Sequence, residues 1–219
     1  MKKIIKVLLA TSSLIIFSTV LTPVSNAAPN KSLDKINCKN TKAKGHTAKI
    51  IDPPEIKGPF KNRTFTFTTN CGNVVIEADG KNAPITVTAL SALAAGGFFN
   101  KTLCHRLTTE NIYVLQCGDP TATGSGGPNF TYRDENLPTP SENNYPAGVV
   151  AMANSGQNTN GSQFFIVYAD TSLPPSYTIW GKVIKGLEIV QMVAKSGVMD
   201  GKKDGLPKQK IGIEKVKVQ

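Results

Sequence analysis

The sequence is poor in several residue types on which common kinds of chemistry depend. It contains only two histidines, His46 and His105, and its four cysteines show no C-x-x-C spacing. Zinc sites usually combine closely spaced cysteines and histidines, so we expect neither a metal centre nor a cofactor. The chain also lacks a G-x-S-x-G motif, which argues against a serine hydrolase.

Three further patterns resemble parts of known functional sites but each lacks a feature that the site requires. Cys104 and His105 are neighbours, but adjacent strand residues point to opposite faces and cannot form a nucleophile–base pair. The Gly-rich segment 119–130 lacks the Gly-Lys-Ser/Thr ending of a phosphate-binding loop. Asp134 and Glu135 are adjacent in a predicted loop, where we expect solvated carboxylates rather than the cleft pair of a glycosidase.

Arginine is scarce, with three residues against 22 lysines, and the formal net charge of +10 is unevenly spread. Residues 30–61 and 182–219 each carry +5, residues 1–29 carry +3, and residues 62–181 carry −3. A nucleic-acid groove would gather basic and aromatic residues on one face, so we expect no nucleic-acid partner. The flanking lysines serve either solubility or loose attraction to an anionic cell wall or membrane.

The first residues have the pattern of a secretory signal peptide. Three lysines among the first six residues precede an apolar run at 7–21, and small residues follow up to Ala27 and Ala28. The run is shorter than the roughly twenty apolar residues of a spanning helix, which favours cleavage of residues 1–28 over an uncleaved anchor. We therefore expect a secreted or cell-envelope protein outside the cytoplasm.

Export changes the interpretation of the four cysteines. An even number of cysteines outside the cytoplasm indicates two disulfides. Cys104 and Cys117 flank a predicted hairpin and can face each other across it, which would leave Cys38 to pair with Cys71. Four cysteines allow three pairings, and the sequence leaves all three open.

The remaining chain divides into a Lys- and Pro-rich extension at 29–61 and one domain at 62–219. Residues 85–95, preceded by Pro84, and residues 186–195 have helical patterns. Alternating or continuous apolar runs predict eight strands, at 64–68, 74–77, 102–107, 112–117, 147–153, 163–169, 178–184 and 211–218. Closing eight antiparallel strands removes exposed edges, so we expect a mainly β fold, a closed barrel capped by two helices.

One arginine stands out within this pattern. Arg106 lies on a predicted apolar strand, where a half-buried charge needs partners. Gln116 and Gln163 are polar residues inside apolar strands, and neutral amides can orient a guanidinium without neutralising it. Apolar walls beside a few polar groups are typical of a ligand site; here they would be Tyr113, Val114 and Phe165. The alternatives are a structural arginine and core packing of the aromatic side chains.

These residues carry a resemblance to a known family. His105-Arg106, the run YVLQCGD at 113–119 and the run MANSGQNTNGSQFF at 152–165 resemble the cyclophilin family of peptidyl-prolyl cis–trans isomerases. The resemblance extends from Thr64 to Val218, and the second run is long and specific. It implies an eight-stranded barrel with two capping helices. The spacing between Cys104 and Cys117 is most similar to secreted or membrane-linked cyclophilins of Gram-positive bacteria.

The resemblance implies a role for each matching position. Arg106 matches the catalytic arginine, and His105 matches a histidine for which we expect a structural role. The positions implied to bind substrate are Tyr113, Val114 and Phe165 in the proline pocket, Gln116 and Gln163 beside the arginine, Ala153 and Asn154 along the peptide backbone, and Leu173 and Tyr177 in the following loop. The implied partners are proline-containing segments of exported proteins, and we expect a monomer.

Several positions depart from the family pattern. The turn between Arg106 and Tyr113 is longer by two residues than in the most familiar members. The loop at 172–175 lacks the family's tryptophan, and Tyr177 replaces a histidine. Trp180 comes too late in the sequence to substitute for the missing ring. Because that tryptophan is associated in the family with cyclosporin binding, we expect weak sensitivity to cyclosporin.

Overall fold

The computed structural model describes residues 36–219, and the predicted signal peptide lies outside the described residues. Residues 63–218 hold all helices and strands of the described part. Within residues 36–219, no helix has the length and apolar character needed to cross a membrane.

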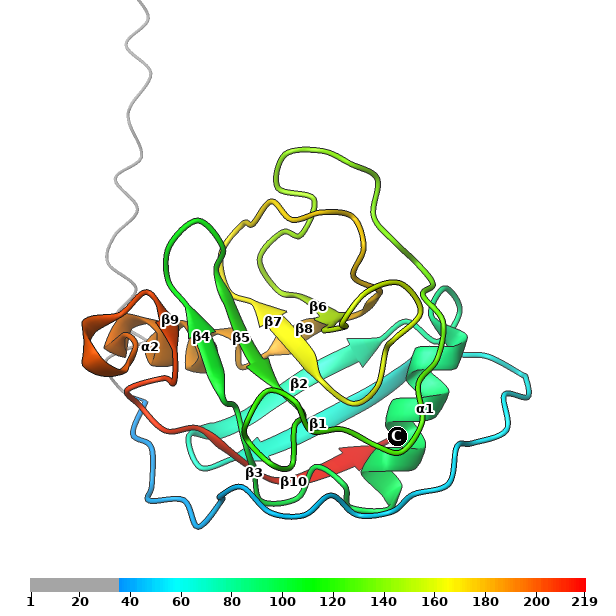
Figure 1. Cartoon of the computed structure of the whole chain (residues 1–219), viewed down its shortest axis with the longest axis horizontal. Helices are drawn as coiled ribbons and strands as arrows, with labels where there is room; N and C mark the ends of the chain where they lie inside the picture. Colours follow the sequence, from blue (N-terminus) through cyan, green and yellow to red (C-terminus); the bar gives the residue numbers. More distant parts are fainter. Residues whose placement is uncertain (1–35) are drawn as a thin grey trace, which may run out of the picture. The chain divides into compact units, whose positions relative to one another are not determined.

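Two α-helices lie at opposite ends of the sheet (Figure 1). Helix α1 spans Pro84–Ala95 and ends at Gly96, and helix α2 spans Leu187–Ser196. Both agree with the predicted helices to within one or two residues. Their apolar faces enter the same core, through Val87, Leu90 and Leu93 of α1 and Ile189, Val190 and Val193 of α2.

The strands form one curled, mainly antiparallel sheet (Figure 1). Its hydrogen-bonded order is β3-β10-β1-β2-β8-β6-β7-β5-β4-β9. The strands are β1 (Arg63–Thr69), β2 (Gly72–Ala78), β3 (Thr102–Leu103), β4 (Arg106–Thr108), β5 (Val114–Cys117), β6 (Val149–Met152), β7 (Phe164–Val167), β8 (Ile179–Lys185), β9 (Asp204–Gly205) and β10 (Gly212–Val218).

The sheet has ten strands where eight were predicted, and two local causes account for the difference. The predicted strand at 102–107 is interrupted at Cys104 and His105, which divides it into β3 and β4. The two-residue strand β9 was missed, because Asp204-Gly205 lies in a polar, Gly-containing segment without an apolar pattern. The prediction of a mainly β fold with two helices is confirmed.

The core fills the concave side of the sheet and is rich in aromatic rings. Trp180, Phe65 and Phe164 are almost fully buried, and the indole packs edge-on against both phenyl rings at centroid distances of 5.4 and 5.8 Å. Trp180 is therefore a core residue.

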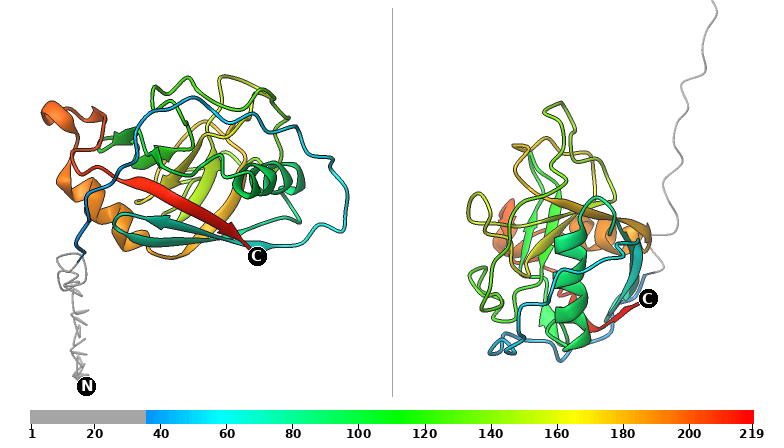
Figure 2. Two further views of the ribbon diagram at one scale, coloured as in Figure 1. Left: turned by 90° about the horizontal axis from the view of Figure 1, so that it is seen from below. Right: turned by 90° about the vertical axis from the view of Figure 1, so that its right-hand side faces the viewer.

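Residues 36–61 contain no helix or strand but run along the outside of the domain from near α2 to near α1 (Figure 2). The Cys38–Cys71 disulfide ties their start to the turn between β1 and β2, and the second disulfide joins Cys104 to Cys117. These are the two pairs that the hairpin prediction favours. Further along, the backbone N–H of His46 donates to the carbonyl of Pro120 at 2.8 Å. This part of the extension thus packs on the domain.

Candidate functional site

The two stretches that carry the family resemblance, residues 105–119 and 152–165, lie side by side in the sheet. Strand β4 pairs with β5, β5 with β7, and β7 with β6. In this register Arg106 is opposite Gln116, and Gln116 is opposite Phe165. Directly paired residues project from the same face of a sheet, so these three side chains form one row across three strands. Residues far apart in the sequence come together here because the β4–β5 hairpin pairs with β7.

Arg106 is held from two sides. Its Nε and Nη2 donate to the two carboxylate oxygens of Asp204 at 2.8 and 2.7 Å, and Nη1 donates to Oε1 of Gln116 at 3.3 Å. The hydrogen bonding of Arg106 to the Asp204 carboxylate is the main cause of the raised pKa of Arg106, and the same interaction lowers the pKa of the Asp204 carboxyl. Sequence reasoning missed Asp204, since nothing in the surrounding Lys-rich segment marks it as a partner.

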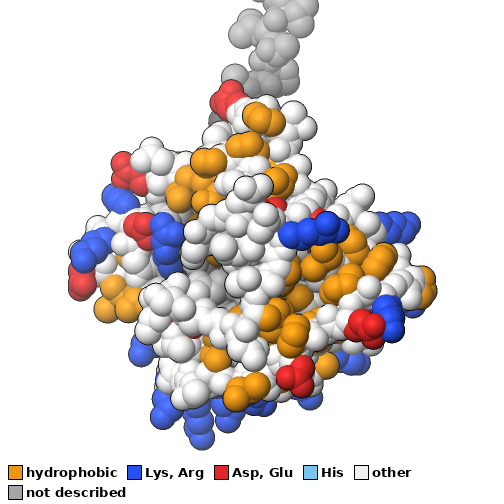
Figure 3. Space-filling model, turned by 45° about the vertical axis from the view of Figure 1, so that its right-hand side comes forward, with side chains coloured by type: hydrophobic (Ala, Val, Ile, Leu, Met, Phe, Trp, Pro, Cys, Tyr) orange, Lys and Arg blue, Asp and Glu red, His pale blue; other side chains and the backbone are white. Residues whose placement is uncertain are grey.

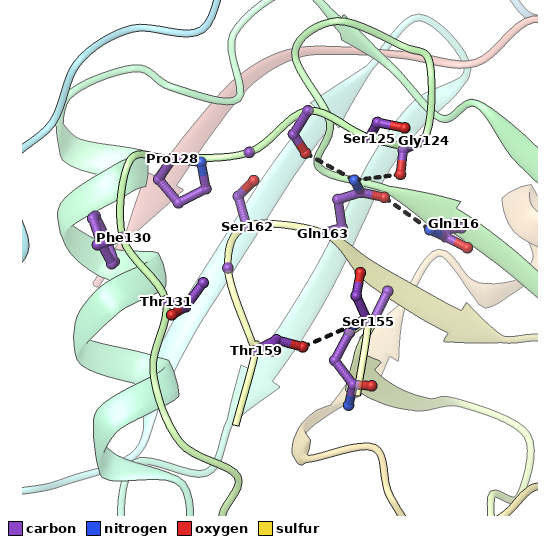
Figure 4. A pocket seen from close by; sticks show the side chains of 15 residues that line it. Gln116, Gly124, Ser125, Pro128, Phe130, Thr131, Ser155, Thr159, Ser162 and Gln163 are labelled. Carbon is purple, nitrogen blue, oxygen red and sulfur yellow. Dashed lines mark hydrogen bonds between the residues drawn. The ribbon is translucent and has the colours of Figure 1, made fainter. Parts of the chain in front are cut away.

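The two glutamines continue the hydrogen bonding across the site (Figure 4). Nε2 of Gln116 donates to Oε1 of Gln163 at 2.8 Å, and Nε2 of Gln163 donates to the carbonyls of Gly124 and Gly126 at 3.0 and 2.8 Å. Each amide therefore has its oxygen and nitrogen orientation fixed by its neighbours. The relay, defined as Asp204, Arg106, Gln116 and Gln163, ends on the Gly-rich loop.

Asp119 fixes the shape of that loop. Its buried carboxylate accepts hydrogen bonds from the backbone N–H groups of Thr121 at 2.7 Å, Thr123 at 3.0 Å and Gly124 at 2.7 Å. Burial alone would raise the pKa of Asp119, but the hydrogen bonds outweigh it and the pKa is lowered. A Cβ atom at Gly126 would lie 2.0 Å from Oδ1 of Asp119, so only glycine permits this close approach.

A polar hollow of about 250 Å³ lies between the Gly-rich loop and residues 153–163 (Figure 4). Gln116 and Gln163 line it, together with Ala153 and Asn154, which the resemblance implies bind the peptide backbone. Asn154 is itself anchored, because its Nδ2 donates to the carbonyl of Ser176 at 2.8 Å. Within residues 36–219, the hollow is lined by backbone, amide and hydroxyl groups and by no charged side chain.

An apolar cluster lies beside Gln116, whose strand partner Phe165 belongs to it. It is separate from the main core, and Ala153, Leu173 and Tyr177 pack against it. The ring of Tyr177 meets that of Phe165 edge-on at 5.5 Å. We call this set the apolar cluster; its buried members are Val114, Tyr145, Ala151, Phe165 and Val167.

Tyr145 is a buried member of this cluster that sequence reasoning did not find. Its hydroxyl donates to the carbonyl of Tyr177 at 3.0 Å and accepts from the Tyr177 N–H at 3.1 Å. The side chain is buried, and burial raises its pKa to about 12. Tyr145 therefore fixes the backbone of Tyr177, whose ring packs against Phe165.

Tyr113 lies next to Val114, just before β5 begins. It is not a member of the apolar cluster, and its ring packs edge-on against Tyr168 at 6.0 Å. The structure brings Val114, Phe165, Leu173 and Tyr177 together. The proline-pocket role implied for Tyr113 stays a prediction.

His105 is buried beneath the relay. Neither ring nitrogen has a hydrogen-bond partner among residues 36–219, and a Cβ atom added at Gly124 would lie 3.8 Å from the ring's Cδ2. Burial lowers the pKa of His105, and the Asp119 carboxylate and Gln163 offset only part of this effect. The imidazole is therefore neutral near pH 7 and fits a packing role.

Comparison with known proteins agrees with this geometry. Residues 64–218 match the family described as cyclophilin type peptidyl-prolyl cis-trans isomerase/CLD. The chain is 40% identical over 198 residues to a probable peptidyl-prolyl cis-trans isomerase B of Mycobacterium leprae, covering 84% of this chain and 67% of that protein. A probable isomerase B of Mycobacterium tuberculosis is 44% identical over 165 residues, covering 70% and 53%.

More distant relatives match over nearly their whole length. Peptidyl-prolyl cis-trans isomerase-like 1 of Aspergillus fumigatus is 36% identical over 154 residues, which cover 69% of this chain and 92% of that protein. A crystal structure of a Cryptosporidium parvum cyclophilin type isomerase superposes with a TM-score of 0.63 at 28% identity, covering 73% and 98%. The matched region contains the whole of the relay and the apolar cluster, and the chain belongs to the cyclophilin-type peptidyl-prolyl cis–trans isomerases.

Proposed function

We propose that this chain accelerates rotation about X–Pro bonds in exported polypeptides, with Arg106 as the catalytic residue. One observation carries the proposal. The guanidinium of Arg106 is oriented by Asp204 and by Gln116, and Gln116 both lines the polar hollow and pairs with Phe165 of the apolar cluster. A charged donor beside a polar hollow and an apolar cluster matches the needs of a prolyl peptide.

The chemistry needs no covalent step. Rotation about the amide bond has a barrier of about 18–20 kcal/mol, and unaided isomerisation takes about tens to hundreds of seconds. In the twisted amide the nitrogen becomes pyramidal and can accept a hydrogen bond. Arg106 donates to that nitrogen or to the neighbouring carbonyl, while the apolar cluster fixes the proline ring. A donor whose bond forms only in the twisted state lowers the barrier selectively.

The size of the effect is compatible with one arginine. Each tenfold in rate needs about 1.4 kcal/mol of selective stabilisation. Removing a single oriented donor from an active site typically costs about 10²- to 10³-fold in turnover. Arg106 can therefore account for several decades of acceleration.

The Arg106→Ala variant tests the proposal. We expect kcat/KM for a proline peptide to fall by about 10²- to 10³-fold, while peptide affinity and circular dichroism stay close to wild type. Arg63→Ala is the matched control, because Arg63 is exposed on β1, which pairs with none of the site strands. Wild-type turnover in Arg106→Ala would contradict the proposal and favour a binding module of the same fold.

We also propose that the chain works outside the cytoplasm. The signal-peptide pattern of the sequence and the two disulfides of the domain support this. The narrower resemblance to secreted or membrane-linked forms of Gram-positive bacteria stays a prediction. Mass spectrometry of the chain from medium and envelope fractions would show a start at Ala28 or Pro29, and an intact cytoplasmic chain would contradict it.

Loose association with an anionic wall or membrane is a further proposal. Basic side chains gather along the lower edge of the face in Figure 3. Lys39 and Lys210 are exposed, and Nδ2 of Asn70 donates to the backbone carbonyls of both, which keeps the two segments together. Release of envelope-bound chain by high salt would support this attraction.

We infer, finally, that the ten strands act as one closed eight-stranded barrel. The segments 102–109 and 203–213 pair with each other across the two ends of the strand order. The backbone N–H of Cys104 donates to the carbonyl of Ile211, and that of Thr109 donates to the carbonyl of Lys203. Slow hydrogen exchange at Cys104 and Thr109 would support closure, and fast exchange would contradict it.

A further inference from the structure

Asp204 reaches the site through the sheet rather than through a loose loop. Strand β9 pairs with β4, with Asp204 opposite Thr108 and Gly205 opposite Leu107. One residue earlier, the backbone N–H of Thr109 donates to the carbonyl of Lys203 at 2.8 Å. The backbone on both sides of Asp204 is thus fixed to the strand that carries Arg106.

The longer turn between Arg106 and Tyr113 contributes to this attachment. Thr109 opens the turn, and its hydroxyl also donates to the carbonyl of Lys203 at 3.3 Å. The ammonium of Lys203 lies 3.9 Å from the carboxylate of Glu110 in the same turn. The longer turn, which departs from the family pattern, therefore contacts Lys203, the residue just before Asp204.

The Asp204 carboxylate accepts two hydrogen bonds from one edge of the Arg106 guanidinium. An arginine has five N–H donors, of which two bind Asp204 and one binds Gln116. The two remaining donors belong to Nη1 and Nη2. Because Asp204 and Gln116 act on different edges of a planar group, they fix the plane itself as well as its position.

We propose that Asp204 is a positioning residue for Arg106. It holds the guanidinium plane so that the two remaining donors face the twisted amide. This inference rests on the proposed function, since it gives Asp204 a role only through the arginine. A long side chain with 42% exposure would otherwise sample several rotamers, and small misplacements of a catalytic group are costly in rate.

A purely structural role for the pair predicts a different result. The Asp204 side chain is 53% exposed, and exposed ion pairs contribute little to stability. Loss of the carboxylate should therefore leave the melting temperature almost unchanged. A loss of turnover without a loss of stability is what separates positioning from packing.

The test compares Asp204→Ala and Asp204→Asn with the matched control Asp200→Asn. Asp200 carries the same charge four residues earlier and has a positive φ of 57°, a conformation that asparagine tolerates. We expect kcat for a proline peptide to fall about tenfold in both Asp204 variants, with KM within about twofold of wild type. Asp200→Asn should keep wild-type turnover.

A double variant shows whether Asp204 acts through the arginine. Arg106→Ala/Asp204→Ala should be no slower than Arg106→Ala alone, because the group to be positioned is already absent. Asp204→Glu retains a carboxylate and should recover part of the turnover lost in Asp204→Ala. This recovery keeps the test informative if the alanine variant folds poorly.

The results that overturn the inference differ from those that overturn the proposed function. Wild-type or higher turnover in Asp204→Ala, with Arg106→Ala inactive, would eliminate positioning and leave the function intact. A double variant slower than Arg106→Ala would show that Asp204 acts on something other than the arginine, which also overturns the inference. Full turnover in Arg106→Ala would instead overturn the proposed function.

Discussion

The two parts of the candidate site, the apolar cluster and the relay beside the polar hollow, are held together by different kinds of contact. Phe165, Ala151 and Val167 of the apolar cluster come from two adjacent strands, β6 and β7. The relay joins groups far apart in the chain, since Arg106 and Asp204 are 98 positions apart and Gln163 and Gly124 are 39 positions apart. The apolar cluster is held by packing between neighbouring side chains, and the relay is held by hydrogen bonds between distant segments.

The difference implies different responses to mutation. Apolar contacts are non-directional, so a smaller side chain weakens binding in proportion to the surface lost. A chain of hydrogen bonds depends on every member, and loss of one releases the groups on both sides. We expect apolar variants to change KM and stability, and relay variants to change kcat.

The largest effect that sharpens this comparison is expected for Phe165→Leu. Loss of the ring should raise KM and lower kcat/KM about tenfold, which corresponds to about 1.4 kcal/mol of binding. Phe164→Leu is the matched control, because Phe164 lies next to it on β7 but is buried in the main core. Steady-state kinetics on a proline peptide, with melting curves for both variants, would measure the two effects separately.

Equal kinetic losses in the two phenylalanine variants would break the comparison. They would mean that the general destabilisation of β7, rather than the ring facing the groove, controls activity. A fall in kcat with unchanged KM in Phe165→Leu would also contradict the assignment of binding to the apolar side.

A smaller effect is expected for Gln163→Leu. The substitution removes the acceptor for Gln116 and both donors to the Gly-rich loop, while the side-chain volume is nearly kept. We expect kcat to fall about fivefold with KM nearly unchanged, because the guanidinium keeps Asp204 but loses the orientation of its other edge. Crystal structures or arginine side-chain NMR would show the displaced guanidinium.

Gln209→Leu is the control for this substitution. Gln209 lies outside the relay, and within residues 36–219 its side chain donates to the neighbouring carbonyl of Lys210 and to no other group. A Gln163→Leu variant with raised KM and unchanged kcat would place the glutamine with the substrate-binding groups and break the distinction between the two sides.

The sequence was most informative where local pattern decides structure. Pro84 and Gly96 bound α1 as predicted, and the alternation along 64–68 is a strand. Val114 and Phe165 meet in one cluster because β5 and β7 are adjacent, which the family resemblance implied. Periodicity and end signals are local properties, so a single sequence can show them.

Long-range polar partners were beyond the same reasoning. Asp204 lies among exposed lysines and glycines, and only the pairing of β9 with β4 brings it to Arg106. Tyr145 lies outside every predicted strand, yet the loop at 172–177 folds over it and makes it part of the site. No periodic pattern encodes a hydrogen bond between segments 98 or 32 positions apart.

The smallest effect concerns pH and tests whether the polar side depends on a buried neutral imidazole. His105 has a lowered pKa in the folded state because of burial, while the unfolded chain has the ordinary value of about 6.5. Below that pH the unfolded state binds a proton that the folded state does not, so stability falls as the pH falls. The charged groups facing the ring are Asp119 and Arg106, and their effects oppose each other.

Between pH 7 and pH 5.5 this single group should therefore lower the free energy of unfolding. Denaturant unfolding of the wild type and of His105→Asn at both pH values measures it, and the variant should lose this part of the pH dependence. The other histidine, His46, is partly buried and is present in both proteins, so the difference between them reports on His105. An unchanged slope in His105→Asn would mean that His105 binds protons equally in the folded and unfolded states, which would contradict a buried imidazole that resists protonation.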